Sequence, residues 1–317
     1  MTAPPGPVPA RLPDFFIVGQ PKTGTTALWE MLDAHPEVFM SAVKEPNYFI
    51  GETRFWNTPE TLDDYLALFA GAGPAQRAGE ASVFYLSSST AASGIAALRP
   101  EAKIIAVLRE PGTLLRSFHL QMVQSRVEPE TDLRRALALE PARREGRSLP
   151  RSGARESQML FYSEQVRYVR QLERFASRFP EDQMLVLIYD DFRADNAAVF
   201  ARILRFLGVS EDVEPAESSA NPTVDVRSLR LDGLVHSVST GRGPLAAVAK
   251  KGLKAVTSER LRRRSLDTFE RRVNYRPPAD PDEELLAELR SRYRPEVEAL
   301  SEYLDRDLVM LWEPGGP

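Results

Sequence analysis

The chain has 317 residues, 43% of them hydrophobic, which is enough for a sizeable core in one large domain or two small ones. The absence of cysteine excludes disulfides, thiolate metal sites and a cysteine nucleophile, and it favours a reducing, cytoplasmic location. The net charge of −4 argues against a nucleic-acid partner, and the histidines, His35, His119 and His236, are too scattered to predict a zinc site.

The amino-terminal segment, "MTAPPGPVPARLP" at residues 1–13, is rich in proline. It lacks the charged and apolar blocks of a signal peptide, so we expect a flexible leader. No apolar run in the sequence approaches the length of a membrane span.

A short apolar run at residues 15–18 predicts a buried strand that ends at Gly19, and apolar residues at helical spacing over 27–32 predict a helix. Thr25 or Thr26 is expected to cap this helix with its hydroxyl. Free N–H groups at such a strand–loop–helix unit favour an oxyanion. The glycine spacing matches the nucleotide-hydrolase pattern G-x-x-x-x-G-K-[ST], but Thr25 stands in the lysine position and Lys22 lies inside the loop. The residues alone fit an anion-binding loop and an ordinary turn with a solvated lysine equally well.

Three further apolar runs predict buried strands at residues 78–86, 103–108 and 183–192. Helices are predicted between them and after them, over 156–180 with Pro180 at its end, and over 197–207 with Gly208 as the stop. Alternating strands and helices indicate an α/β fold with a central parallel sheet flanked by helices on both faces. In such sheets ligands bind at the carboxyl ends of the strands.

Two segments carry charge rather than apolar pattern. Residues 125–155 are rich in Arg, Glu, Pro and Gly, and predict a surface excursion. Residues 244–272 form a basic amphipathic stretch. This stretch either contacts a membrane surface or an anionic ligand, or it is the solvated face of a helix.

A second candidate anion site follows the strand "KIIAVL". Arg109 comes directly after it, then a proline–glycine turn and a helix that carries Ser117 eight residues later. Guanidinium recognises oxyanions through a planar fork of donors, so the two residues can converge on one phosphate. By itself, Arg109 is equally suited to capping a strand end or pairing with an acid.

The two sites together resemble those of the sulfotransferases that use 3′-phosphoadenosine 5′-phosphosulfate (PAPS). "PKTGTTAL" is similar to their 5′-phosphosulfate loop, and "LREPGTLLRS" to their 3′-phosphate motif. "HPEVFMSAVKEPNYF", "GEASVFYL" and "FPEDQMLVLIYDDFRAD" extend the resemblance to the branch with heparan sulfate sulfotransferase domains and many bacterial enzymes. The resemblance implies a P-loop-like sheet in a single domain over residues 14–317, and a PAPS-dependent sulfotransferase.

The resemblance also implies roles for individual residues. Lys22 would contact the phosphosulfate and stabilise the departing adenosine 3′,5′-bisphosphate, without a dedicated metal. Arg109 and Ser117 would hold the 3′-phosphate, which distinguishes PAPS from ATP. Glu45, with Lys44 beside it, would be the catalytic base, although the pair alone also fits an exposed salt bridge. The 5′-phosphate would be held by Thr23, Gly24, Thr25 and Thr26.

The chain departs from the family pattern at two points, Ala81 and the segment that closes over PAPS. Ala81, in Glu80-Ala81-Ser82, replaces a second lysine of several relatives, for which Lys44 is a possible substitute. Arg276 is the best positional match to the segment that closes over PAPS. His119 either faces the acceptor or is a packed or solvated histidine, and His35 is assigned to structure.

Two other classes of function stay open on the sequence. A small-molecule or nucleotide kinase shares the loop and sheet, but needs a lysine at position 25 and an acidic magnesium ligand at a strand end. The other is a non-catalytic module that binds the nucleotide or a partner protein. The acceptor of a sulfotransferase would be a hydroxyl, phenol or amine on a small molecule, lipid or glycan, and the composition mildly favours a bacterial source.

Overall fold

The computed structural model describes residues 11–51, 55, 57–150, 157–213, 225–226, 275–276 and 282–313, and gives the backbone alone at residues 157, 225–226 and 275–276. Residues 1–10 of the predicted leader, the basic stretch 244–272 and His236 lie outside the described residues. The end of the leader is packed against the fold: the Arg11 guanidinium donates to the Asp14 carboxylate at 2.8 Å and to the Gln76 carbonyl at 2.6 Å.

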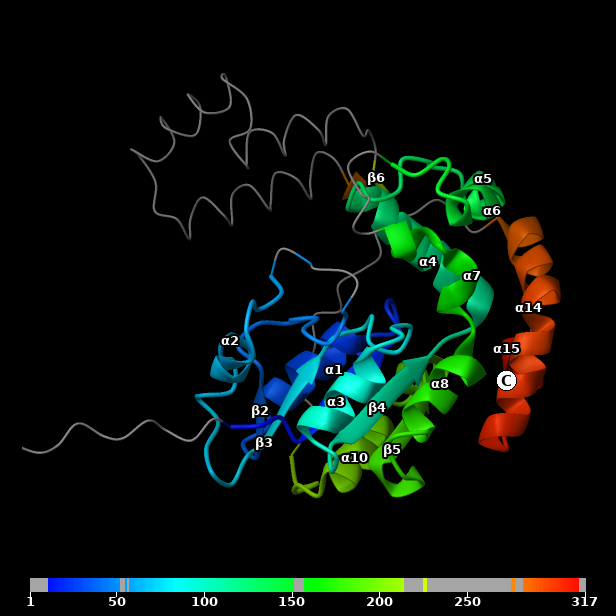
Figure 1. Cartoon of the computed structure of the whole chain (residues 1–317). Coiled ribbons are helices and arrows are strands. Elements are labelled where there is room, and N and C mark those ends of the chain that lie inside the picture. The colour runs from blue at the N-terminus through cyan, green and yellow to red at the C-terminus, as the bar shows by residue number, and fades with distance from the viewer. Residues whose placement is uncertain are drawn as a thin grey trace, which may run out of the picture.

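Five parallel strands form the central sheet in the order β2-β3-β1-β4-β5 (Figure 1). After β1 the chain forms β2 and β3 on one side of β1, and after β4 it forms β5 on the other side of the sheet. The strand order therefore reverses between the neighbours β1 and β4, which is where open α/β sheets form their ligand crevice. The strands are β1 (Phe15–Gly19), β2 (Val38–Met40), β3 (Arg77–Ala81), β4 (Lys103–Leu108) and β5 (Met184–Ile188).

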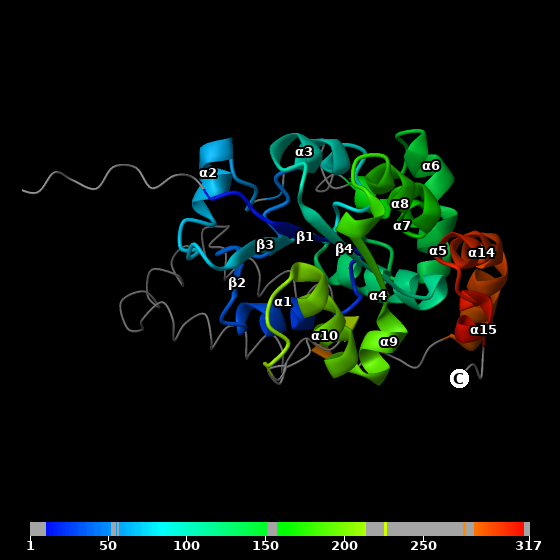
Figure 2. The ribbon, with the colours of Figure 1, turned by 90° about the horizontal axis from the view of Figure 1, so that it is seen from below.

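Helices cover both faces of this sheet (Figure 2): α1 (Thr25–Asp33) and α10 (Asn196–Leu207) on one face, α3 (Ala91–Leu98) and α8 (Tyr168–Ala176) on the other. The helix α4 (Pro111–Gln124) shares an apolar cluster with α3 and α8. Successive side chains of a strand point to opposite faces. In β1, Phe16 and Val18 pack into the apolar cluster of α3, α4 and α8, whereas Phe15 and Ile17 pack with α1 and α10. The predicted two-sided α/β fold is confirmed.

Most predicted elements appear, some with shorter bounds. β1, β4 and α10 match their predictions, and Gly208 ends α10 with a left-handed φ of 70°. The strand predicted over 78–86 ends at Ala81, and the one predicted over 183–192 ends at Ile188. A short helix, α9 (Tyr189–Ala194), follows β5 directly. The strand β2 was not predicted.

The single helix predicted over 156–180 is wrong. The segment forms a 3₁₀ turn, η1 (Ser157–Leu160), then α7 (Tyr162–Gln165) and α8, with non-helical backbone at Phe161 and Val166. A straight helix buries one stripe of side chains. Here the buried residues point all round a helical wheel, so the chain breaks to bury them: Met159, Leu160, Tyr162, Val166 and Tyr168.

The predicted surface excursion at 125–155 also has a buried part. It forms α5 (Leu133–Ala138) and α6 (Glu140–Arg144). The Arg143 guanidinium donates two hydrogen bonds of 2.7 Å to the Glu128 carboxylate, and both side chains are fully buried. The Tyr162 hydroxyl donates a third at 2.9 Å. The pairing allows these two charges to leave water.

The carboxyl-terminal helices α14 (Glu283–Leu304) and α15 (Leu308–Trp312) were not predicted as elements. In Figure 1 α14 runs along the outer side of α4 and α8, and it contacts both helices. No helix in the described part of the chain has the length and apolarity to cross a membrane. The remaining elements are α2 (Leu62–Ala67), η2 (Glu181–Gln183), and β6 (Asp225–Val226) paired antiparallel with β7 (Tyr275–Arg276).

Candidate active site

The loop between β1 and α1 leaves the amino terminus of α1 open. Gly24 is the N-cap with a left-handed φ of 77°, and no side chain caps the helix, so the expected hydroxyl cap by Thr25 or Thr26 is wrong. The first backbone bond of the helix runs from the Leu28 N–H to the Gly24 carbonyl. The preceding N–H groups at the start of α1 therefore have the orientation and partial charge that favour an anion.

Glycine at position 24 is required by its neighbours as well as by its φ angle. A Cβ there would lie 3.1 Å from the ring of Phe192 and 3.3 Å from the ring of Tyr189. Both aromatic residues belong to α9, which directly follows β5. The first turn of α9 thus packs against the loop, a contact that the prediction of one long strand over 183–192 missed.

The Lys22 side chain has no hydrogen bond or ion pair to the described part of the chain. Its pKa is lowered below the usual lysine value, chiefly by burial and then by the positive charges of Arg109 and Lys44, while Glu45 acts in the opposite direction. Two other cations therefore lie close enough to oppose a third positive charge. An incoming anion would relieve both the repulsion and the lost hydration.

The threonines of the loop have different roles. The Thr23 hydroxyl donates to the Gln20 carbonyl at 2.6 Å and is buried, so it holds the loop together from within. The Thr26 hydroxyl accepts a hydrogen bond of 2.7 Å from the Lys44 ammonium. Thr25, in the first turn of α1, is buried. The predicted phosphate contact of Thr23 would thus fall to its backbone N–H.

Lys44 and Glu45 lie beside the loop. The Lys44 ammonium is 3.1 Å from a Glu45 carboxylate oxygen, and both side chains are about one-third exposed, at 27% and 31%. Through the contact with Thr26, this pair joins the first turn of α1. The sequence-predicted residues Lys22, Lys44 and Glu45 are therefore brought together.

The backbone at Glu45 is held in place by three contacts. Its φ is 56°, in the left-handed region that glycine favours, and its N–H donates to the Ala81 carbonyl at 3.0 Å. The side-chain amides of Asn47 and Asn57 donate to the Glu45 carbonyl at 2.8 and 3.0 Å. Sequence reasoning missed both asparagines, although their short amides are frequent partners of local backbone.

Glu80 lies in a buried network. Its carboxylate accepts hydrogen bonds from the hydroxyls of Tyr65, Ser82 and Tyr85 at 2.7, 2.6 and 2.9 Å. Complete burial raises its pKa to about 7, against the lowering effect of these hydrogen bonds. Ser82 in turn accepts the Asn47 N–H at 3.0 Å. Glu80 therefore supports the segment that carries Glu45.

Ala81, where several relatives carry a lysine, is fully buried in the apolar cluster that includes Ile17. Lys44, from another segment, places an ammonium next to the loop through its contact with Thr26.

Arg109, at the end of β4, links the two predicted anion sites. Its Nη1 donates to the Lys22 carbonyl at 2.9 Å, and its Nε donates to the Thr113 hydroxyl at 3.2 Å. The guanidinium lies over the Tyr189 ring, 4.8 Å from its centroid. Burial lowers its pKa, against the effect of acids and tyrosines nearby.

Ser117 lies one turn beyond Thr113 on α4, so both face the same side of the helix. The chain turns into α4 at Glu110, whose carboxylate caps the helix by accepting the N–H groups of Gly112 and Thr113. The expected proline–glycine turn is therefore the first turn of the helix itself. Ser117 thus lies on the helix face with which Arg109 is in contact.

The other residues considered in the sequence are His119, Arg276 and His35. His119 is 2% exposed, its Nε2 is 2.8 Å from the Glu130 carbonyl, and burial lowers its pKa. These are the surroundings of a packed histidine, and its catalytic role stays a prediction. Only the backbone of Arg276 is described; it belongs to β7, whose partner strand β6 contacts α4. His35 bonds to the Ser210 carbonyl and the Glu37 N–H, in line with its structural assignment.

Known proteins share sequence with this chain. Residues 12–224 match the family model described as the sulfotransferase domain, a range that includes Lys22, Glu45, Arg109 and Ser117. The chain is 31% identical over 205 residues to human bifunctional heparan sulfate N-deacetylase/N-sulfotransferase 2, covering 63% of this chain and 22% of that protein. It is 33% identical over 156 residues to mouse carbohydrate sulfotransferase 15, covering 36% of this chain and 28% of that protein.

Among solved structures, the sulfotransferase from Alicyclobacillus acidocaldarius superposes with a TM-score of 0.67 at 25% identity, covering 94% of this chain and 98% of that one. The chain spans only about a fifth to a quarter of the length of the curated relatives it matches. The family match, however, covers more than half of the chain and all of the β1–α1 and β4–α4 units. The chain belongs to the sulfotransferase family.

Proposed function

We propose that the protein transfers the sulfuryl group of PAPS to a hydroxyl or amine of a small molecule, lipid or glycan. The observation that carries this proposal is the hydrogen bond from Arg109 to the Lys22 carbonyl, which joins the loop after β1 to the end of β4. A nucleotide with phosphates at both its 5′ and 3′ positions needs cations in two such places. Membership of the sulfotransferase family supports the same donor.

The residues present fit this donor. The uncapped first turn of α1 supplies N–H groups, and Lys22 supplies an ammonium free to contact the 5′-phosphosulfate. Arg109 and Ser117 would bind the 3′-phosphate. Arg276 remains the proposed contact from the segment that closes over the nucleotide.

In the proposed reaction the acceptor oxygen or nitrogen attacks sulfur. A new bond to sulfur forms while the bond between sulfur and the 5′-phosphate oxygen breaks, and the acceptor's proton passes to the Glu45 carboxylate. Lys22 stabilises the charge left on the phosphate of adenosine 3′,5′-bisphosphate. Lys44 holds Glu45 within 3.1 Å and keeps its carboxylate beside the loop.

The kinase alternative is disfavoured by the acids at the strand ends. After β5, the Asp190 carboxylate accepts the Trp312 indole N–H at 2.9 Å, and Asp191 forms two hydrogen bonds with the Arg306 guanidinium. Glu80, in β3, is held by three hydroxyls. Each of these possible magnesium ligands is engaged elsewhere, and position 25 is a threonine.

The acceptor class and the location of the protein are part of the proposal. The printed names of the relatives include heparan sulfate and carbohydrate sulfotransferases, which supports a glycan among the possible acceptors. A cytoplasmic location is supported by the absence of cysteine. Transfer of labelled sulfate from PAPS to any acceptor in a cell extract, identified by mass spectrometry, tests the activity and separates it from the non-catalytic alternative.

We expect adenosine 3′,5′-bisphosphate to bind without divalent metal, because Lys22, Arg109 and the N–H groups of α1 already supply positive charge. Isothermal titration calorimetry in EDTA should give the same affinity as in magnesium. In the described part of the chain, no three His, Cys, Asp or Glu side chains are placed to hold a metal ion, but this alone decides nothing about the reaction. Binding that vanished on chelation and returned with magnesium would favour a kinase.

We expect Arg109→Ala to weaken adenosine 3′,5′-bisphosphate far more than adenosine 5′-phosphate, because only the former carries the phosphate that Arg109 would contact. A charge-assisted hydrogen bond contributes about 1.5–3 kcal/mol, so the selective loss should be about ten- to a hundredfold. Calorimetry with both nucleotides measures it, and Arg205→Ala, at an exposed ion pair on α10, is the control. Equal losses for both nucleotides would mean that Arg109 merely supports the fold.

A further inference from the structure

A pocket of about 470 Å³ lies beside the candidate active site, between the segment that follows β3, the segment of Ile50 and Phe55, and the helices α7 and α8. Its volume is in the range of pockets for small organic ligands. One wall is apolar and largely aromatic, and is formed by Ile50, Phe55, Phe84, Met159 and Phe161. The rings of Phe55 and Phe84 stack with their centroids 5.7 Å apart.

Two chain connections place the pocket near the reacting groups. The Asn57 amide donates to the Glu45 carbonyl at 3.0 Å, and Phe55 is only two residues away, which is at most about 7 Å of chain. On the other side, the Gln171 amide donates to the Glu164 carbonyl and accepts from the Gln20 amide, both at 2.5 Å. Gln20 belongs to the same loop as Lys22. The walls of the pocket are therefore continuous with the segments that carry Glu45 and Lys22.

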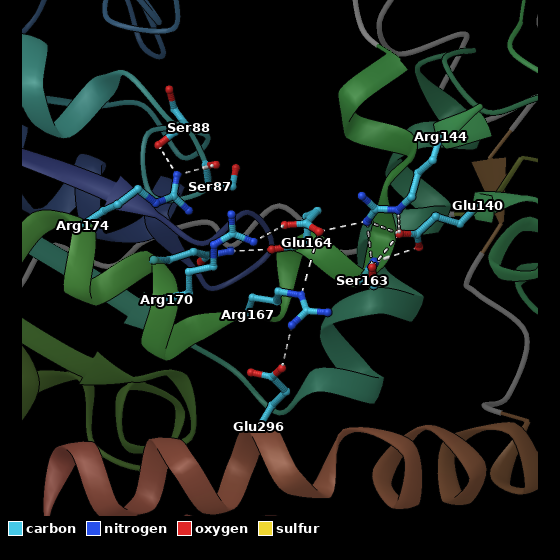
Figure 3. A network of polar contacts seen from close by, with 11 residues as sticks. Ser87, Ser88, Glu140, Arg144, Ser163, Glu164, Arg167, Arg170, Arg174 and Glu296 are labelled. Atoms are coloured by element: carbon cyan, nitrogen blue, oxygen red, sulfur yellow. Dashed lines mark hydrogen bonds and ion pairs between the residues drawn. The ribbon is translucent and has the colours of Figure 1, made fainter. Parts of the chain in front are cut away.

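The opposite wall carries excess positive charge (Figure 3). Arg170 and Arg174 line the pocket together with one acid, Glu164. The Glu164 carboxylate is shared, because it lies 2.9 Å from Arg144 and 3.8 Å from both Arg167 and Arg170. Arg144 also pairs with Glu140, and Arg167 with Glu296, so these acids balance the two arginines outside the pocket lining. Of the residues that line the pocket, Glu164 is the single carboxylate beside two guanidinium groups, and one positive charge remains in excess.

Arg174 has no carboxylate partner among the described residues. Its Nη1 donates to the carbonyls of Ser87 and Ser88, which are neutral, and Figure 3 shows its guanidinium pointing toward these two serines. Its pKa is lowered, first by burial and then by the charge of Arg170. A partly buried cation next to a second cation is the arrangement that an anionic ligand stabilises.

A second observation also points to a ligand. The Gln165 side chain lines the pocket and is 3% exposed, yet its buried amide oxygen has no hydrogen-bond partner. A buried polar atom without a partner is costly, and is uncommon in a native structure unless something binds there.

We propose that this pocket binds the non-reacting part of the acceptor, and that Arg170 and Arg174 select acceptors in which an apolar or aromatic body carries a carboxylate or sulfate. This inference rests on the proposed sulfotransferase function, since it assigns the acceptor class of the same site. The hydroxyl of such an acceptor lies toward Glu45, and its anionic group lies against the arginines.

The experiment compares two probes with the same hydroxylated naphthalene rings, 6-hydroxy-2-naphthoate and its uncharged methyl ester. Their fluorescence is titrated with the full chain saturated with adenosine 3′,5′-bisphosphate. We expect the naphthoate to bind about ten- to a hundredfold more tightly than the ester, the usual range for a charge-assisted contact. The difference should shrink at high salt.

Variants assign the preference to the arginines. Arg174→Gln should remove most of the preference for the naphthoate and change ester binding by less than about twofold, because only the charged contact is lost. Arg170→Gln, at an exposed side chain, should weaken the naphthoate about two- to fivefold. Arg205→Gln, at an exposed arginine of α10 that is paired with Glu211, is the matched control and should change neither.

The Arg174 contacts with Ser87 and Ser88 also support the loop, so thermal unfolding is measured for each variant. If Arg174→Gln unfolds, the salt dependence and Arg170→Gln decide. The inference would be overturned if the two probes bound equally well or if the naphthoate did not bind. Where Arg174→Gln unfolds, it would also be overturned if Arg170→Gln left the preference unchanged. Failure of the proposed function would look different: adenosine 3′,5′-bisphosphate would not bind, or labelled PAPS would transfer to no acceptor, whatever the naphthoate does.

Discussion

Glu45→Gln should lower turnover by about two to four orders of magnitude while the affinity for adenosine 3′,5′-bisphosphate stays nearly unchanged. An acceptor hydroxyl cannot keep its proton once its oxygen bonds to sulfur, so a base within hydrogen-bond reach is needed. Glutamine keeps the shape of the side chain and removes its basicity. Single-turnover transfer from labelled PAPS measures the chemical step, and calorimetry measures the nucleotide affinity.

The choice of Glu45 over other acids follows from its surroundings. Glu45 is about one-third exposed and its ion-pair partner, Lys44, is bonded to Thr26 at the first turn of α1. Glu80 is fully buried and already accepts three hydroxyl donors, so it has little capacity left for an acceptor. Glu298→Gln, at an exposed ion pair on α14, is the control for removing a paired glutamate.

A different distribution of effects would contradict this assignment. If Glu45→Gln kept near-normal turnover while Glu80→Gln or His119→Ala abolished it without loss of folding, another residue would be the base. Ser82→Ala helps to interpret a loss of turnover in Glu80→Gln. Ser82 joins Glu80 to the Asn47 N–H, and so to the segment of Glu45. Similar losses in both variants would indicate that Glu80 positions this segment.

Lys22→Met should lower turnover by about a hundred- to a thousandfold, the effect of removing one preorganised group that stabilises charge in the transition state. Methionine keeps the length of the side chain and removes the charge. Lys44→Met is the comparison: it removes the other ammonium near the loop, the one that is paired with Glu45. Near-normal turnover in Lys22→Met together with a large loss in Lys44→Met would mean that the two lysines have the opposite roles.

The same variant tests the pKa of Lys22. Burial and the neighbouring cations lower this pKa, so in the free protein the ammonium loses its proton at a lower pH than an ordinary lysine. Only the protonated form attracts a phosphate, so the affinity for adenosine 3′,5′-bisphosphate should fall as the pH rises through this lowered pKa. Because a bound anion favours the charged form, binding should also take up protons in that range. Lys22→Met should lose this part of the pH dependence.

Sequence patterns alone determined the elements whose causes are local. The apolar run at residues 15–18 predicted the buried strand β1, which ends at Gly19 as expected. The same holds for β4 and for Gly208 at the end of α10. Parallel strands place their carboxyl ends along one edge, so the sequence could also predict that the Lys22 loop and Arg109 lie at the same edge of the sheet. That β1 and β4 are direct neighbours was shown only by the fold.

Other features depend on which distant segments pack together, and no local pattern records that. Burial in several directions broke the helix predicted over 156–180, and the turn of α9 onto the Lys22 loop ended the strand predicted over 183–192. His119 is packed because α4 lies against the segment of Glu130, a contact that its position near Ser117 does not reveal.

The surroundings of the reacting groups were likewise decided by tertiary structure. The hydrogen bond from Lys44 to Thr26 spans 18 residues, and the burial of Glu80 depends on tyrosines from two other segments. The pocket beside them is formed by residues from positions 50 to 174. The sequence alone therefore determined which chemical groups this protein has and on which strand ends they lie. Only the fold decided which of them keep free charges, because desolvation and hydrogen bonding depend on neighbours that are remote in the chain.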